Sequence, residues 1–333
     1  MGAAGLRAPA TFVRQHLVVR NHSPILSQQG KRMTDFLSLC IADVPLAVHW
    51  EETADLDPLE PGYESFRGRT QKGQEAIHIQ IHPELPDSWD IDKFEKIYAS
   101  GQSWSLFRNG TDHLLAIDPP EFKQLPLCAA RFNHQALNEV DIHYNRLVVK
   151  EAGGRRFIPN PFSYPLDRLL MMYILAEREG VMMHAAGVEI DGKGYIFPGR
   201  SGTGKSTLSR KFVSRRGPVV LNDERVVVRK IDGEFNAFGT PWPGDAEIAV
   251  NRGLPLSGIF FIHHGARDRI REIQPGEALK RLLPLSSIPW FDPERMSRVL
   301  LFCEDLISRV PSYDLYFTPD GVVDMMEGFG SYA

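Results

Sequence analysis

The chain contains the run Tyr195-Ile196-Phe197-Pro198-Gly199-Arg200-Ser201-Gly202-Thr203-Gly204-Lys205-Ser206-Thr207-Leu208-Ser209, and the rest of the fold can be built around it. A short β-branched and aromatic segment enters a glycine-rich turn, and the residues from Lys205 to Arg215 are predicted to be helical. This order of strand, turn and helix is the context that the phosphate-loop (Walker A) pattern G-x-x-x-x-G-K-[ST] requires. The run therefore predicts a P-loop nucleotide-binding core.

The residue types in this run fit the binding of a polyphosphate. Gly199, Gly202 and Gly204 can adopt positive φ, so that consecutive backbone N–H groups turn inward, and the helix directs its positive end at the same place. Lys205 is expected to reach the β and γ phosphates of ATP, and the Ser206 hydroxyl is expected to bind Mg²⁺. The alternative is a glycine-rich hairpin that binds nothing. The predicted phosphate-binding residues are Gly199, Arg200, Ser201, Gly202, Thr203, Gly204, Lys205, Ser206 and Thr207.

Composition restricts the class of protein. The 333 residues are 43% hydrophobic and 24% charged, which is typical of a globular protein with a substantial core. A net charge of −4 gives no reason to expect nucleic-acid binding, and no apolar run has the ~20 residues that cross a membrane. Three cysteines far apart in the sequence, Cys40, Cys128 and Cys303, suit the reducing cytoplasm and argue against a disulfide scaffold.

The pattern divides the chain into a leader and two domains. Residues 1–34 are basic and contain no acid, so we expect a disordered leader, or a true start at Met33, rather than a transit peptide. Residues 35–150 are predicted to form a smaller, mostly-β domain, and residues 151–164 a linker. The strands predicted in this domain are Phe36–Ile41, Leu46–Trp50, Ala76–Ile81, Trp104–Arg108, Leu114–Ile117 and Arg146–Val149.

Residues 165–333 are predicted to form the α/β nucleotide-binding domain. A helix is expected from Pro165 to about Gly180, because apolar residues recur at helical spacing. The other elements expected are strands at 181–190, 195–198, 219–221, 226–230, 234–238 and 259–263, helices at 277–283 and 292–310, and a closing strand pair at 313–318 and 321–323.

Two acids and one histidine are candidates for chemistry near the loop. Asp223 and Glu224 follow the apolar run Val219-Val220-Leu221, where a carboxylate could bind Mg²⁺ and a base could serve an attacking hydroxyl. A solvated acidic turn is the alternative. His184 follows an apolar run and precedes small residues, so it could face a ligand or a carboxylate, and a structural histidine is the alternative.

These residues together resemble a known family. Met183-His184, Gly187-Val188-Glu189-Ile190, Gly199 to Ser206 and Asp223-Glu224-Arg225-Val226 resemble the C-terminal catalytic domain of HPr kinase/phosphorylase. The loop together with Asn222-Asp223-Glu224 is also similar to phosphoenolpyruvate carboxykinase, which shares that nucleotide-binding core. The resemblance covers roughly residues 180 to 265.

The resemblance implies roles for single residues. His184 falls on a family histidine that is a metal ligand in the carboxykinases and an active-site residue in the kinases. Asp223 falls on an acidic position of both patterns, so we expect it, rather than Glu224, to bind the metal together with Ser206 and His184. Arg252 aligns with a basic residue near the transferred phosphate of the kinases. Thr207 stands where the kinase/phosphorylase carries an acid, which argues against phosphorylase activity.

The expected function is an HPr kinase-like phosphotransferase that uses ATP and Mg²⁺ to phosphorylate a hydroxyl. The acceptor is a serine of a protein or peptide, or a small metabolite, with Asp223, Glu224, His184 and Lys205 as catalytic residues. HPr kinases assemble as oligomers, so the resemblance also implies a homo-oligomer. The alternatives are a non-catalytic nucleotide-binding module of a peptide-modification system and an ATP-dependent phosphoenolpyruvate carboxykinase, although the substrate residues of the carboxykinases have no match before Met183.

Overall fold

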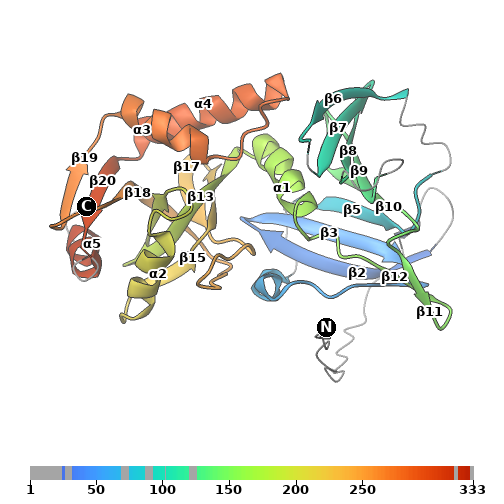
Figure 1. Cartoon of the computed structure of the whole chain (residues 1–333), viewed down its shortest axis with the longest axis horizontal. Helices are drawn as coiled ribbons and strands as arrows, with labels where there is room; N and C mark the ends of the chain where they lie inside the picture. Colours follow the sequence, from blue (N-terminus) through green and yellow to red (C-terminus); the bar gives the residue numbers. More distant parts are fainter. Residues whose placement is uncertain are drawn as a thin grey trace, which may run out of the picture.

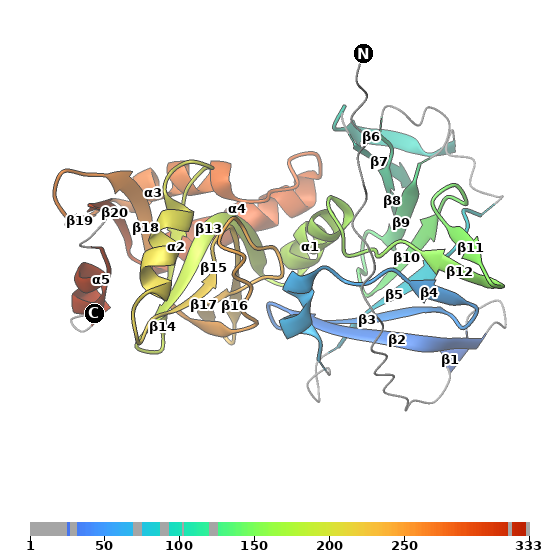
Figure 2. The same ribbon diagram turned by 60° about the horizontal axis from the view of Figure 1, so that its bottom comes forward.

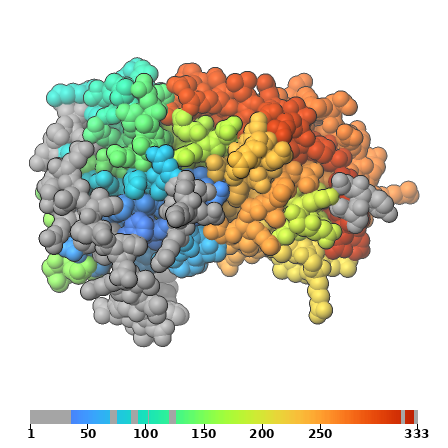
Figure 3. Space-filling view, turned by 180° about the vertical axis from the view of Figure 1, so that it is seen from behind, coloured from blue at the N-terminus to red at the C-terminus, as the bar shows by residue number. Residues whose placement is uncertain are grey.

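The computed structural model describes residues 25–26, 32–68, 75–86, 93–101, 103–119, 126–318 and 322–330. The fold is mixed α/β. One large sheet lies at each end of the molecule, and helix α1 lies between them (Figure 1). Seen from behind, the two halves of the chain are in direct contact (Figure 3). No helix within these ranges is long and apolar enough to cross a membrane. The expected leader lies outside the described residues except for residues 25–26 and 32–34.

The first half forms a nine-stranded sheet in the order β1-β2-β3-β5-β10-β9-β8-β7-β6. The central strand β5 pairs in parallel with β3 and β10, and the other neighbours are antiparallel. A smaller sheet, β11-β12-β4, lies beside it (Figure 2). The strands are β1 (Ile25–Leu26), β2 (Arg32–Ile41), β3 (Val44–Glu51), β4 (Ala54–Leu56), β5 (Ile77–His82), β6 (Glu95–Ala99), β7 (Trp104–Asn109), β8 (Asp112–Ile117), β9 (Cys128–Asn133), β10 (Glu139–Tyr144), β11 (Lys150–Ala152) and β12 (Arg155–Ile158).

The second half forms an eight-stranded sheet in the order β14-β13-β16-β17-β18-β20-β19, with β15 paired to β13. Strand β14 also pairs with β18, so that β13, β14, β16, β17 and β18 close a ring. The strands are β13 (Gly180–Ile190), β14 (Lys193–Pro198), β15 (Val219–Asn222), β16 (Arg225–Ile231), β17 (Glu234–Phe238), β18 (Gly253–His264), β19 (Arg269–Glu272) and β20 (Ser312–Phe317).

Helices cover the second sheet on both sides. Helices α2 and α5 share one apolar cluster with the sheet, and helices α3 and α4 share another, so the two pairs lie on opposite sides (Figure 1). The helical elements are η1 (Pro61–Phe66), α1 (Leu166–Glu177), α2 (Lys205–Val213), α3 (Pro275–Leu282), η3 (Leu283–Leu285), α4 (Pro293–Arg309) and α5 (Val322–Gly330).

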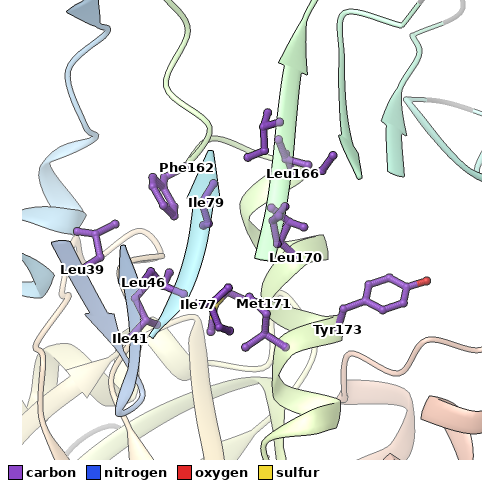
Figure 4. Close-up of a cluster of buried hydrophobic side chains, with 14 of the residues drawn as sticks. Leu39, Ile41, Leu46, Ile77, Ile79, Phe162, Leu166, Leu170, Met171 and Tyr173 are labelled. Atoms are coloured by element: carbon purple, nitrogen blue, oxygen red, sulfur yellow. The ribbon is translucent and has the colours of Figure 1, made fainter. Parts of the chain in front are cut away.

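Helix α1 joins the halves through a shared core. Its apolar face, including Leu170 and Met171, packs against Leu46 and Ile77 of the first sheet (Figure 4). The same cluster contains Trp242 from the second half. Burial of such side chains stabilises by about 1.5–3 kcal/mol each, so the two halves are held together by a continuous apolar core.

Several predicted elements differ from the structure. Residues 146–149, expected as a strand, form a turn because the Asn145 side chain accepts a hydrogen bond from the Leu147 amide. The expected linker contributes β11 and β12, and β12 pairs with β4. Val322 and Val323, expected in a strand with Gly321, begin helix α5 because both are buried against α2 and the sheet; Gly321 lies outside the described residues. The boundary between the two domains stays a prediction.

Candidate functional site

The phosphate-loop pattern lies between β14 and α2. Strand β14 ends at Pro198, the turn follows, and α2 begins at Lys205. Gly202 (φ +82°) and Gly204 (φ +100°) occupy backbone conformations that side chains disfavour, and Gly204 is the N-cap of α2. The Thr203 hydroxyl donates to the Arg200 carbonyl at 2.8 Å and closes the turn. The unpaired N–H groups of the first helical turn therefore face the loop.

Lys205 is folded back into this turn. Its side chain is only 4% exposed, and its Nζ donates to the carbonyl oxygens of Gly199 at 2.9 Å and Arg200 at 3.1 Å. Burial lowers the pKa of Lys205, and the nearby carboxylate of Glu224 opposes that shift. The loop thus holds a buried ammonium group at its centre.

His184 and Glu224 meet at this ammonium group. His184 Nε2 lies 2.8 Å from Glu224 Oε1 and 3.0 Å from Lys205 Nζ, and Glu224 Oε2 lies 3.9 Å from the same nitrogen. Nε2 can donate to Glu224 when protonated or accept from Lys205 when not, but it cannot do both. The hydrogen bond from His184 lowers the pKa of Glu224, against the effect of burial, so this carboxylate is ionised at neutral pH.

Asp223 has a different role from its neighbour. It is fully buried, its Oδ1 accepts from the Gly244 amide, and its Oδ2 accepts from the Ala246 amide, both at 2.8 Å. The Asn222 amide donates to the carbonyl oxygens of Thr240 and Trp242. These two side chains therefore hold the loop 239–246, and Glu224 is the carboxylate nearest Lys205.

The same loop is anchored to the first half of the chain. Trp242 Nε1 donates to Asp167 Oδ2 at 2.6 Å, and the Tyr63 hydroxyl donates to the same oxygen at 2.7 Å. All three side chains are buried. A Cβ added at Gly62 would lie 2.4 Å from the Pro241 carbonyl oxygen, so the segment before Tyr63 also fits closely against this loop.

The remaining predicted residues are distributed as follows. Ser206 is half-buried in the first turn of α2, and Arg200, Ser201 and Thr207 are exposed around the loop. Arg252 is not brought to the others, because it forms an ion pair with Glu189. Glu189 lies five residues along β13 from His184, about 16 Å at the usual rise of a strand.

Two arginines at the site were not singled out by the sequence analysis. Arg225 begins β16 and lies opposite His184 in the ladder with β13, and Arg168 lies in the first turn of α1. The signal for Arg225 was its place directly after Glu224. Arg168 carries no local signal, because only the packing of α1 brings it to this place.

A cavity opens on the other flank of the loop. It has a volume of about 310 Å³ and is bounded by Gly199 and Arg200, by His263 of β18, and by Lys280 and Arg281 at the end of α3. Larger hollows of about 410 and 540 Å³ lie elsewhere and contain no residue of the loop. Space for part of a ligand is therefore available next to the turn.

Part of the chain matches a known protein family. Residues 167–321 are similar to the family described as SynChlorMet cassette protein ScmC. The matched segment is somewhat less than half of the chain, and it includes the phosphate loop, His184, Glu224 and both arginines. A search among curated proteins found no match.

Proposed function

We propose that this chain is a kinase that uses ATP and Mg²⁺ to phosphorylate a hydroxyl group. The observation that carries the proposal is the convergence of Lys205, His184 and Glu224 on one point at the mouth of a glycine-rich turn. The proposed core is the P-loop type shared by HPr kinase and phosphoenolpyruvate carboxykinase. The three free cysteines are compatible with the cytoplasm as its compartment.

The residues of the turn fit a nucleotide. The N-terminal N–H groups of α2 and the buried ammonium group of Lys205 are donors suited to polyphosphate oxygens. The hydroxyl of Ser206 and the carboxylates of Asp223 and Glu224 form an oxygen donor set that suits Mg²⁺. When bound, Mg²⁺ supplies charge neutralisation at the phosphate oxygens.

In this proposal the side chains also have roles beyond binding the nucleotide and the metal. The Glu224 carboxylate, kept ionised by His184, accepts the proton of the acceptor hydroxyl. Lys205 stabilises negative charge on the transferred phosphoryl group. Asp223 keeps the loop 239–246 in place, and His184 orients Glu224. Phosphoryl transfer depends mainly on such positioning and charge neutralisation.

The test is transfer of label from γ-³²P-ATP by the purified protein to a species in a lysate of its host. Lys205→Ala should lower transfer by about 10²–10³-fold, the loss expected when one charge-stabilising donor is removed. Lys150→Ala, an exposed lysine on β11, is the matched control. Full labelling by Lys205→Ala would refute the assignment.

A nucleotide-binding module without catalysis is the second candidate. It is favoured by Asp223, since both of its oxygens already accept backbone hydrogen bonds. ATP that binds to the protein but loses no γ-phosphate with any acceptor fraction of the lysate would support this candidate over the kinase.

A further inference from the structure

Two guanidinium groups lie beside the site without a carboxylate partner. The Nε atoms of Arg168 and Arg225 are both buried and have no hydrogen-bond partner. Within the described part of the chain, no carboxylate forms an ion pair with either side chain. A buried donor without a partner costs about 1–3 kcal/mol, so two of them at one place need a reason.

A chain of hydrogen bonds connects the segments that carry the two groups. Asp167, next to Arg168, accepts from Trp242 Nε1, and the Trp242 carbonyl accepts from Asn222. Asn222 Oδ1 in turn accepts from the Arg225 amide. Burial lowers the pKa of Arg225, and the positive charge of Arg168 lowers it further. Arg168 also lies over the ring of Tyr164, 5.1 Å from the ring centroid, and that ring is 70% exposed. Neighbouring like charges repel each other, and an anion close to both offsets this repulsion.

Among the residues that the structure describes, the nearby carboxylates form no ion pair with either arginine. Glu224 attracts Arg225, but its Oε1 is held by His184 at 2.8 Å. Asp167 precedes Arg168 in the sequence, but its Oδ2 accepts hydrogen bonds from Trp242 and Tyr63. The positive charge is therefore available to a ligand.

The pair faces the proposed reaction centre. Directly opposed residues of an antiparallel ladder point to the same face of a sheet, so Arg225 shares a face with His184. Burial lowers the pKa of Lys205, and the positive charge of Arg225 adds to this shift. An anion held by Arg225 would therefore lie next to Glu224 and the ammonium group.

We propose that Arg168 and Arg225 form a binding site for a carboxylate or phosphate group carried by the acceptor. The inference rests on the proposed kinase function and names its substrate class: hydroxyl compounds or peptides with an anionic group near the hydroxyl. Guanidinium groups suit such anions because their planar forks donate two parallel hydrogen bonds. The phosphates of the nucleotide are assigned to the turn at Gly199–Ser206.

The test measures binding of inorganic phosphate as the probe. ³³P-phosphate is titrated by equilibrium dialysis against the full chain saturated with Mg²⁺ and the β,γ-imido analogue of ATP, so that the turn is occupied. Wild type should bind one saturable equivalent. Arg168→Gln and Arg225→Gln should each raise the Kd for phosphate by at least ~10-fold. Arg108→Gln, which removes an exposed arginine of β7 paired with Glu95, is the matched control.

Thermal unfolding gives a second measurement on the same proteins. Since neither arginine has a carboxylate partner, each glutamine variant should unfold at the wild-type temperature or higher in buffer without phosphate. With the turn again occupied by Mg²⁺ and the ATP analogue, added phosphate should raise the unfolding temperature of wild type and not that of the variants.

The outcomes separate the two proposals. Unchanged phosphate binding in both glutamine variants, or no saturable binding in wild type, overturns the anion site. A variant that loses affinity for ATP but not for ADP shows that the pair holds the γ-phosphate, which also overturns it. If the nucleotide analogue does not bind but phosphate binding still depends on both arginines, the anion site stands and the kinase function fails.

Discussion

Arginine side chains lie on both flanks of the glycine-rich loop, but only those on one flank are paired with a carboxylate. On the flank of β18 and β20, the buried carboxylate of Asp314 lies 2.7 Å from His263 Nε2 and 2.5 Å from nitrogens of both Arg271 and Arg281. On the flank of β13 and β16, Arg168 and Arg225 have no such carboxylate. His263 and Arg281 bound the cavity next to the turn, and Arg225 lies opposite His184, which contacts Lys205 of the same turn. Proximity to the turn alone therefore does not distinguish the two groups.

This difference indicates which cations stabilise the fold and which are available to bind a ligand. A carboxylate buried among three donors offsets part of their charge and connects β18, β19, β20 and α3, so its effect should appear in stability. Cations without a carboxylate contribute no such bond, and their effect should appear in ligand binding. Each prediction below tests one side of this contrast.

The largest effect is expected at Glu224. Glu224→Gln keeps the size of the side chain but removes the base and its charge, and should lower the rate of phosphoryl transfer by about 10²–10⁴-fold. The rate of γ-³²P transfer under single-turnover conditions measures this. Glu234→Gln, an exposed residue of β17, is the control and should keep the wild-type rate. A Glu224→Gln enzyme with normal transfer would assign the base elsewhere.

Asp314 should affect stability instead of transfer. Hydrogen bonds from Arg271, His263 and Arg281 lower the pKa of Asp314 although its burial acts to raise it. Asp314→Asn removes the charge that those cations share, so the free energy of unfolding should fall by about 2 kcal/mol, as measured by urea denaturation.

The control for that variant is Asp305→Asn. Asp305 forms a half-exposed pair with Lys230 at 2.7 Å, and its loss should cost under about 1 kcal/mol. If Asp314→Asn instead abolishes transfer while the protein stays as stable as wild type, Asp314 and its cations are part of the reaction centre. Pairing with a carboxylate would then not distinguish structural from functional cations.

The difference between paired and unpaired cations could not be predicted from the sequence, although the glycine-rich turn could. The turn at Gly199–Ser206 and the adjoining hairpin depend on neighbouring residues, so local patterns predict them. The position of Arg168 beside Arg225 depends on residues 57 apart in the chain, and the sequence shows nothing of that packing. The hydrogen bond that the Gly244 amide donates to Asp223 is equally non-local, so the sequence, which favoured Asp223 over Glu224 as the metal ligand, could not show that Asp223 holds the loop 239–246.

Strand β10 could have been predicted from the sequence, whereas helix α5 could not. Val140, Ile142 and Tyr144 of β10 alternate with polar residues, which is the standard signature of a half-buried strand. Helix α5 was not predictable in this way, because Val322 and Val323 favour strands and only their burial against α2 makes the helix the better state.

The acid side of the pH profile should move when His184 is replaced. The hydrogen bond from His184 is the main cause that lowers the pKa of Glu224 below its usual 4.5, so wild-type transfer should fall only below that pH. A carboxylate with a lowered pKa also adds stability above pH 4.5, which is lost as the pH falls through its folded-state value.

His184→Asn removes this bond, so the pKa of Glu224 should rise and the acid limb should shift to higher pH. The rate of transfer from pH 4 to 8, measured for both proteins with folded fractions checked at each pH, tests this shift. An acid limb at the same pH in both would mean that Glu224 is not the titrating base.

The smallest effect is expected at Arg252. The resemblance to HPr kinases implied a place near the transferred phosphate for this residue, but the structure pairs it with Glu189. This arginine is half-exposed, and exposed pairs stabilise by at most about 1 kcal/mol. Arg252→Gln should therefore change the free energy of unfolding by less than that amount and leave both phosphate transfer and phosphate binding at wild-type values. Arg252 has a carboxylate partner, and Arg225 has none within the described part of the chain. A rise in the Kd for phosphate in Arg252→Gln comparable to that in Arg225→Gln would show that a carboxylate partner does not separate structural from ligand-binding arginines in this protein.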